Sequence, residues 1–223
     1  MKFPSKIQWI FFDVGGVLLD DSVIFGQEFI ELERMILPYN PEITIAMLKA
    51  YVPTASATPG AFIANIIRYF IADASVAEEV RKRFKKEFFD THLYVRLSHV
   101  RPEAHRVLEN LSKHFHLGFM GNQPVETLEK LRESGILEYF HHQKMSGHYA
   151  KGLIKPNPEF FKAVLDDTGA RVEESVIVDY NIERGLIPAK ALGMTTVWYK
   201  LLEREVTEGT VDYTITSLSE LVE

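Results

Sequence analysis

The fold of this chain is decided by the stretch Ile7-Gln8-Trp9-Ile10-Phe11-Phe12-Asp13-Val14-Gly15-Gly16. Its first six residues are rich in β-branched and aromatic side chains, which favours a short buried strand. Asp13 and the glycine pair after it interrupt the apolar run, and glycines in this position mark a tight turn. We therefore predict a buried parallel strand over residues 7–12 that feeds a loop, with the Asp13 carboxylate at the strand end.

A long helical pattern follows this loop. Apolar residues such as Phe25, Phe29 and Leu32 recur at the spacing of one helix face, and similar stripes run through residues 62–70 and 80–88. Prolines break the pattern into three or four helices. They are Pro38, Pro41, Pro53 and Pro59. The sequence thus predicts an all-α insert after the first strand.

Strand and helix patterns alternate in the rest of the chain. The strands that we predict cover residues 115–120, 143–145, 176–178, 195–199 and 213–215. One predicted helix begins at Pro102, and three further helices cover residues 125–134, 158–168 and 187–192. This alternation indicates an α/β fold with a doubly wound parallel sheet, covered by helices on both faces. Ligands of such sheets bind at the carboxyl ends of the strands, so the loops at 13–17, 121–124 and 179–183 are the candidate site.

The composition narrows the functional classes. A chain of 223 residues with 46% hydrophobic and 25% charged residues is typical of a globular protein with a substantial core. A net charge of -6 gives no general attraction to nucleic acid or anionic membranes, and no apolar run reaches the roughly 20 residues of a membrane span. Because the chain has no cysteine, disulfides, thiolate metal sites and a cysteine nucleophile are excluded. We expect a cytoplasmic protein whose partner is a small molecule.

Asp13 is the first candidate for chemistry. A carboxylate at a strand end can act as a nucleophile or as a metal ligand, and the amides of a glycine-rich loop around Gly16 can hold an anion. The competing interpretation is an aspartate that only caps its own turn. The sequence around Asp13 favours the first interpretation.

Four segments, in the same order, resemble the haloacid dehalogenase superfamily. Phe11-Phe12-Asp13-Val14-Gly15-Gly16-Val17-Leu18 is similar to its first motif, and Leu117 to Asn122 resembles its second, a strand that ends in Ser/Thr-Asn. Lys155-Pro156-Asn157-Pro158-Glu159-Phe160-Phe161 looks like the segment that carries the family's lysine. Val176 to Met194 resembles the closing acidic motif. The predicted helical insert stands where the family has a helical cap.

The resemblance implies both an organisation and a mechanism. It implies a Rossmann-like core made of residues 1–19 and 96–223, with a helical cap at residues 20–95. Family members attack a phosphate ester, or in one branch a halogen-bearing carbon, with the aspartate that Asp13 matches. In the phosphatase branch Mg2+ bridges this aspartate and the substrate phosphate, with a carbonyl two residues later, that of Gly15, as a further ligand. Lys155 would stabilise the charge that develops on the phosphoryl group.

Two glycines depart from the family pattern. Gly15 stands where the phosphatases have a second aspartate that protonates the leaving group, and such general acid–base help is typically worth about two to four orders of magnitude. Gly121 replaces the hydroxyl residue of the second motif, although the backbone amides of Gly121 and Asn122 could still bind the substrate phosphate. A slow enzyme, or one whose substrate has a good leaving group, is compatible with this site.

The closing motif allows two alignments. Without a gap, its two acidic positions fall on Tyr180 and Gly185, and neither carboxylate remains. With one extra loop residue, Asp179 ends the strand and Glu183 follows four residues later, which keeps two oxygen ligands near Asp13. We favour Asp179 as a metal ligand because it directly follows the predicted strand at 176–178.

Our leading hypothesis is a Mg2+-dependent phosphatase of a small phosphorylated metabolite that forms an aspartyl-phosphate on Asp13. The alternative from another class is a pseudoenzyme, a binding module that keeps the fold after the changes at Gly15, Gly121 and Tyr180. A third hypothesis is a 2-haloacid dehalogenase, which needs no metal and no second aspartate. The glycine pair is, however, not the usual first motif of that branch.

Overall fold

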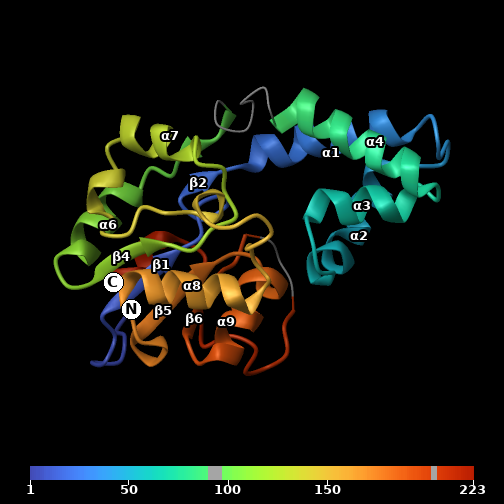
Figure 1. Cartoon of the computed structure of the whole chain (residues 1–223). Helices are drawn as coiled ribbons and strands as arrows, with labels where there is room; N and C mark the ends of the chain where they lie inside the picture. Colours follow the sequence, from blue (N-terminus) through green and yellow to red (C-terminus); the bar gives the residue numbers. More distant parts are fainter. Residues whose placement is uncertain (90–96, 202–204) are drawn as a thin grey trace. The chain divides into compact units, whose positions relative to one another are not determined.

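The structure, a computed structural model, describes residues 1–89, 97–201 and 205–223. The chain divides into two compact units (Figure 1). One comprises residues 1–20 and 99–223 and is called the α/β unit; the other comprises residues 21–98 and is called the helical unit. The boundary predicted between residues 95 and 96 lies outside the described residues.

A five-stranded parallel sheet forms the centre of the α/β unit, with the strand order β4-β1-β5-β6-β7. The strands are β1 (Trp9–Phe12), β4 (His116–Phe119), β5 (Ser175–Asp179), β6 (Thr195–Tyr199) and β7 (Tyr213–Ile215). Phe12 at the end of β1 is opposite Phe119 of β4 on one side and Val178 of β5 on the other. The register therefore brings the carboxyl ends of these three strands together.

Helices cover both faces of this sheet (Figure 1). They are α6 (Ala104–Ser112), α7 (Thr127–Glu133), α8 (Pro158–Thr168) and α9 (Ile187–Leu192). Side chains alternate along a strand, so Phe12 packs in one core with Leu108 of α6, whereas Phe11 packs in the other with Phe161 of α8. The predicted doubly wound α/β fold is confirmed.

The ends of α8 follow from its sequence. The Asn157 side chain accepts a hydrogen bond of 3.1 Å from the Glu159 amide, and Pro158 occupies the first turn, where no intrahelical partner for its nitrogen is needed. Gly169 ends the helix with a φ of 67°, a left-handed conformation that glycine adopts at little cost. These signals place the helix directly after the segment that contains Lys155.

The strand that we predicted at residues 143–145 is wrong. Next to it the structure has only an isolated bridge between Gly118 and His142. The side-chain Nε2 of Gln143 donates instead to the carbonyl oxygens of Leu137 and Phe140, both at 3.1 Å. Side-chain hydrogen bonds to the preceding turn thus hold Gln143 at the place where a sixth strand was predicted.

A small antiparallel pair lies where the chain leaves and re-enters the α/β unit. It consists of β2 (Leu19–Asp20) and β3 (His99–Val100). The Arg101 amide extends this pairing by donating to the Leu18 carbonyl at 2.9 Å. The two crossing segments of the α/β unit are therefore tied to each other by backbone hydrogen bonds.

Within its described residues the helical unit contains four α-helices and a π-helical turn. They are α1 (Ser22–Ile36), α2 (Ile45–Ala57), α3 (Phe62–Phe70), α4 (Ala74–Phe84) and η1 (Lys85–Phe89). Their buried stripes, among them Leu32 and Val80, form one core. Pro53 lies inside α2 and does not end it, contrary to our prediction, because Leu48 and Ala55 on either side pack in the same core.

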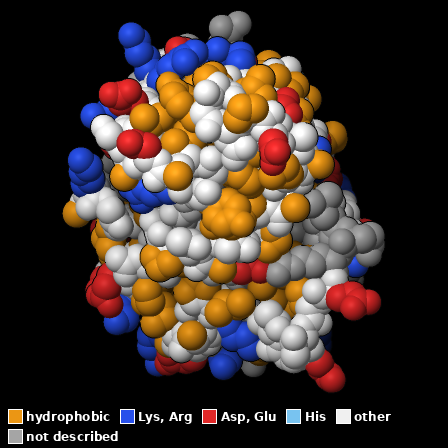
Figure 2. Space-filling model, turned by 90° about the vertical axis from the view of Figure 1, so that its right-hand side faces the viewer, with side chains coloured by type: hydrophobic (Ala, Val, Ile, Leu, Met, Phe, Trp, Pro, Cys, Tyr) orange, Lys and Arg blue, Asp and Glu red, His pale blue; other side chains and the backbone are white. Residues whose placement is uncertain are grey.

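Several large apolar side chains of the helical unit remain exposed. They are Val23, Ile30, Leu37, Tyr39, Met47 and Tyr69. Figure 2 shows apolar side chains interspersed with charged ones over the face that it presents. Among the described helices, none combines the length and the apolar character that crossing a bilayer requires.

Candidate active site

Three strand ends form the candidate site. Asp13 follows β1, Gly121 and Asn122 follow β4, and Asp179 is the last residue of β5. The Asp13 amide still donates to the Val178 carbonyl at 2.9 Å, so the backbone of Asp13 is held as part of the sheet. Rigid strands thus present these residues at one edge, where ligands bind in open parallel sheets.

Lys155 joins the two carboxylates of this edge. Its ammonium nitrogen lies 3.1 Å from Asp13 Oδ1 and 2.5 Å from Asp179 Oδ2. All three side chains are at least nine-tenths buried. The structure therefore brings together Asp13, Lys155 and Asp179, three residues that the sequence singled out over a span of more than 160 positions.

The charges in this cluster shift each other's titration. Burial raises the pKa of Asp13 to about 7; Lys155 lowers it and Asp179 raises it further. Burial by itself would lower the pKa of Lys155, but the two aspartates raise it above its ordinary value. Lys155 is accordingly a fixed cation, whereas Asp13 changes its charge near neutral pH.

Asn122 and Arg184 hold the backbone of Lys155. The Asn122 side chain accepts from the Lys155 amide at 2.8 Å and donates to the Lys155 carbonyl at 2.9 Å. The Arg184 guanidinium donates to the same carbonyl. Burial lowers the pKa of Arg184, while Tyr180, Asp179 and Asp13 act in the opposite direction. The side chain of Asn122 thus positions the lysine, whereas our prediction of substrate binding concerned the backbone amide of this residue.

Asp179, and not Tyr180 or Gly185, places a carboxylate beside Asp13. Its Oδ1 accepts a hydrogen bond of 2.8 Å from the Asn181 amide, and its Oδ2 accepts from Lys155. In the described part of the chain, no three histidine or acidic side chains are arranged to hold a metal ion, so Glu183 does not complete a triad with the two aspartates.

Two glycines of the predicted site leave room for side chains. A Cβ at Gly121 would lie 2.9 Å from Asp13 Oδ1, and a Cβ at Gly16 would lie 2.7 Å from the ring of Tyr180. Gly16 also has a φ of 75°, which other residues rarely adopt. Gly15, two residues after Asp13, forms an isolated bridge with Leu19, the first residue of β2. The glycines thus allow close packing around Asp13.

Sequence reasoning missed Arg101 and Arg184. Arg101 donates to the carbonyl oxygens of Gly16 at 2.8 Å and Val17 at 3.0 Å, and its guanidinium lies over the ring of Tyr199. It fixes the second half of the Asp13 loop. Arg184 could have been found as the cation in the loop after β5, but no local pattern connects Arg101 to a loop 85 residues earlier.

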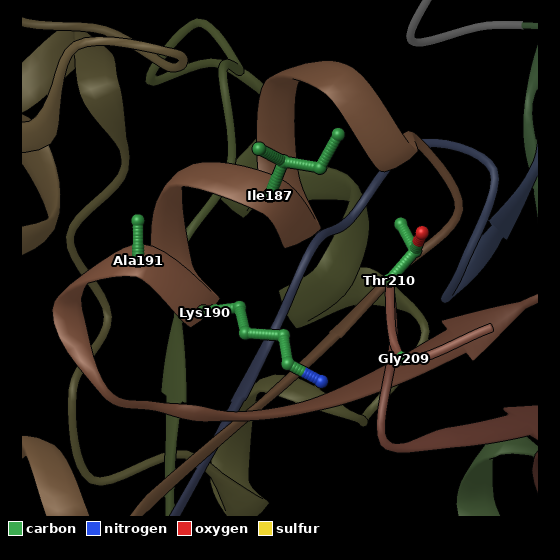
Figure 3. A pocket seen from close by; sticks show the side chains of 5 residues that line it. All are labelled: Ile187, Lys190, Ala191, Gly209 and Thr210. Atoms are coloured by element: carbon green, nitrogen blue, oxygen red, sulfur yellow. The ribbon is translucent and has the colours of Figure 1, made fainter. Parts of the chain in front are cut away.

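An open hollow of about 290 Å³ lies elsewhere on the α/β unit. Figure 3 shows it between α9 and a later loop, lined by Ile187, Lys190, Ala191, Gly209 and Thr210. None of these residues belongs to the predicted site, and the ammonium of Lys190 is paired with Asp212 at 2.7 Å. The hollow therefore brings no charged group to the chemistry at Asp13.

The comparison with protein families identifies the chain. The family model described as haloacid dehalogenase-like hydrolase matches residues 7–193. The chain belongs to this family. This hydrolase is therefore an enzyme of the haloacid dehalogenase superfamily, as the four ordered segments of its sequence indicated.

Three curated relatives carry the name glyceraldehyde 3-phosphate phosphatase, and two of them illustrate the range of the match. The one from Methanocaldococcus jannaschii is 28% identical over 230 residues, covering 94% of this hydrolase and 96% of the relative. The one from Pyrococcus furiosus is 32% identical over 133 residues, 55% of this hydrolase, and the match spans only about half, 52%, of that relative. Both names describe the relatives themselves.

A solved structure shows the same fold. A hydrolase of this type from Bacillus subtilis, bound to magnesium, matches with a TM-score of 0.60 and 21% identity over 96% of each chain. Members of the superfamily generally use Mg2+. The oxygen donors of this hydrolase suit that ion, because Mg2+ is usually held by one or two carboxylates, waters and substrate phosphate. Each carboxylate of Asp13 and Asp179 has more lone pairs than its described hydrogen bonds use.

Proposed function

We propose that this enzyme is a phosphatase that hydrolyses a small phosphorylated metabolite through an aspartyl-phosphate on Asp13. The observation that carries the proposal is the buried Lys155 ammonium 3.1 Å from the Asp13 carboxylate at the end of β1. A fixed cation beside a nucleophilic carboxylate stabilises the negative charge that a phosphoryl group spreads over its oxygens during transfer. The curated relatives named as phosphatases support the same chemistry.

The reaction has two steps in this proposal. The Asp13 carboxylate attacks phosphorus, and the bond from phosphorus to the ester oxygen breaks, so the leaving alcohol departs with the electron pair and takes a proton from water. Water then attacks the phosphorus of the aspartyl-phosphate, releases inorganic phosphate and restores the Asp13 carboxylate. Lys155 remains charged throughout and keeps its contacts with Asp179.

The glycine at position 15 limits the first step. Gly15 has no side chain that could donate a proton to the leaving oxygen, so the proton must come from solvent. We expect turnover to depend steeply on the basicity of the leaving group, with acyl and aryl phosphates faster than alkyl phosphates. The missing acid corresponds to about two to four orders of magnitude for a poor leaving group.

The donors for Mg2+ are Asp13, the Gly15 carbonyl and Asp179 in this proposal. When bound, the ion would neutralise charge on the phosphoryl oxygens and orient them toward Asp13. Gly16, Gly121 and Asn122 would contribute backbone amides to the substrate phosphate. The helical unit, residues 21–98, would act as the cap that supplies specificity, and three-carbon phosphate esters are the first substrates to try because of the relatives' name.

The test is phosphate release from a panel of esters. It includes glyceraldehyde 3-phosphate, glycerol 3-phosphate, acetyl phosphate and p-nitrophenyl phosphate, each with and without Mg2+. Wild-type enzyme should release phosphate, Asp13→Asn should not, and Asp166→Asn, which alters an exposed aspartate on α8, should match wild type. The proposal is wrong if no ester is hydrolysed faster by wild type than by Asp13→Asn. Chloride release from chloroacetate would instead reveal a dehalogenase.

A further inference from the structure

The carboxylate of Asp179 lies where a side chain of residue 185 would begin. Gly185 is buried in the π-helical turn η5 (Ile182–Leu186), directly after the strand that ends at Asp179. A Cβ on Gly185 would overlap both Cγ and Oδ2 of Asp179. The two side chains therefore exclude each other: an aspartate can hold this conformation at 179 only if residue 185 is glycine.

Conformational freedom does not explain this glycine. Seven other glycines have a positive φ, among them Gly16 and Gly193. The φ of Gly185 is not positive, and this residue lies in a helical turn. An alanine could adopt the backbone of residue 185 and would usually favour a helical turn by roughly 1 kcal/mol. Space for the Asp179 carboxylate is thus the structural reason for a glycine here.

The overlapped atom is the one that holds the lysine. Asp179 Oδ2 is 2.5 Å from the Lys155 ammonium, and Oδ1 is fixed at 2.8 Å by the Asn181 amide. The carboxylate cannot swing away from residue 185 without losing at least one of these bonds. Since the Asp179 side chain is fully buried, no solvent is available to replace a lost partner.

We propose that Gly185 is a positioning residue of the active site. Its missing side chain admits the Asp179 carboxylate, which sets the Lys155 ammonium beside Asp13. In this chain the acidic group of the closing motif comes from residue 179, and it occupies the space that a side chain of residue 185 would fill. The two alignments that the sequence left open thus place an acidic group in the same space. The consequence for catalysis rests on the proposed phosphatase function, whereas the consequence for packing does not.

The first test is Gly185→Ala. The added methyl group must displace the carboxylate of Asp179, and a displacement of about 1 Å at a catalytic group can lower turnover about a hundredfold. We expect kcat to fall by at least about tenfold, with KM changed less because the substrate itself is not contacted. The matched control is Gly26→Ala in α1, where a Cβ meets open space, and it should keep wild-type kcat. Wild-type kcat in Gly185→Ala would overturn the proposal.

The second test exchanges the two residues. Asp179→Gly removes the carboxylate, and Gly185→Asp places two carboxylates in one space, so each single variant should lose activity and stability. The double variant Asp179→Gly/Gly185→Asp has a single carboxylate at this place. The Cβ of its new side chain at position 185 would occupy the position of Asp179 Oδ2 in wild type, so we expect the carboxylate to reach Lys155. It should exceed both single variants in kcat by about tenfold, a coupling that independent sites do not show.

The unfolding midpoints of wild type, the two single variants and the double variant test the role of Gly185 independently of activity. A double variant more stable than both single variants supports the exchange, also when a single variant does not accumulate as folded protein. A double variant no better than the weaker single variant in both kcat and midpoint overturns it. If wild type hydrolyses no phosphoester, the proposed function fails, and the midpoints alone still test the role of Gly185.

Discussion

The α/β unit and the helical unit each bury a carboxyl group, but they place different charges beside it. Asp13 in the α/β unit is 6% exposed, and its burial, opposed by Lys155 and reinforced by Asp179, gives a pKa of about 7. Glu28 in the helical unit is 7% exposed, and its burial, reinforced by the carboxylate of Asp21, raises its pKa to about 8. The pKa of Asp13 is lowered by a neighbouring cation, Lys155, as well as raised by a like charge. The charged neighbour that acts on the pKa of Glu28 is a like charge, Asp21.

The difference shows what turns a buried acid into a nucleophile. A nucleophilic carboxylate must be ionised and must also be poorly solvated, and burial supports only the second requirement. Lys155 supplies the first for Asp13. The raised pKa of Glu28 keeps this group mostly protonated at pH 7, and no cation acts among the causes of its shift. Substitutions of Lys155, of the residues that contact it, Asp179 and Asn122, and of Glu28 test this comparison. Their expected effects on turnover decrease in that order.

The largest effect is expected for Lys155→Met, which removes the cation and keeps a side chain of similar length. Two buried carboxylates are then left without their ammonium, and removal of one partner of a buried ion pair typically costs about 3–5 kcal/mol. Turnover should fall by about two to three orders of magnitude, as for the loss of one preorganised electrostatic contact. Denaturant unfolding and phosphate release at pH 7.5 measure both effects.

Lys151→Met is the matched control for this variant, because Lys151 is exposed and lies four residues earlier in the same segment. It should behave as wild type in both measurements. If Lys155→Met were as stable and as active as Lys151→Met, the buried cluster would have no functional role, and the cation beside Asp13 would not distinguish Asp13 from Glu28.

The next effect is the pH dependence of kcat/KM. Because Asp13 must be ionised to attack, kcat/KM should fall about tenfold for each pH unit below about 7 and be level above it. Asp179→Asn removes a like charge, so the midpoint should move to lower pH in this variant. The substrate's own phosphate titration must be subtracted. A midpoint that stays unchanged in Asp179→Asn would contradict the coupling between the two aspartates.

Asn122→Ala should have a smaller effect, of about tenfold in kcat. The variant removes two hydrogen bonds to the backbone of Lys155 and leaves its amide without this partner, which costs about 1–3 kcal/mol of stability. If the Asn122 side chain instead acts mainly on the substrate phosphate, KM would rise while stability stayed constant; the backbone amide of residue 122 is kept in this variant. Asn110→Ala, at an exposed position of α6, controls for the substitution itself.

The sequence predicts the sheet and the catalytic strand ends well because these depend on local signals. The apolar run before Asp13 and the one before Asp179 identify two buried strands, and a parallel sheet must place their ends side by side. The role of Lys155 could be predicted only from the order of all four segments, since a lysine before a proline has no distinctive pattern of its own. The residue types at the site were therefore predictable wherever a strand or a motif carried them.

What the sequence did not reveal depends on contacts between distant loops. The backbone of Lys155 is held by Asn122 from the loop after β4 and by Arg184 from the turn after β5, and neither contact has a periodic signature. The role of Gly185 was hidden for a further reason. A missing side chain is informative only when the atoms that fill its space are known, and these belong to Asp179. Packing, not pattern, decides such positions.

The smallest effect on turnover is expected for Glu28→Gln, which keeps the shape of a buried group and removes its titration. In wild type the folded state keeps a proton on Glu28 that the unfolded chain releases between about pH 4.5 and 8, so this group lowers the stability as pH rises through that window. The stability difference between the variant and wild type should be smallest at the acid end of this window, near pH 4.5, and should grow in favour of the variant up to pH 8, with kcat changed less than about twofold. Thermal unfolding across this range measures the difference. A constant difference between the two proteins at all pH values would show that Glu28 has the same pKa in the folded and the unfolded chain, and the contrast with Asp13 would then rest on Lys155 alone.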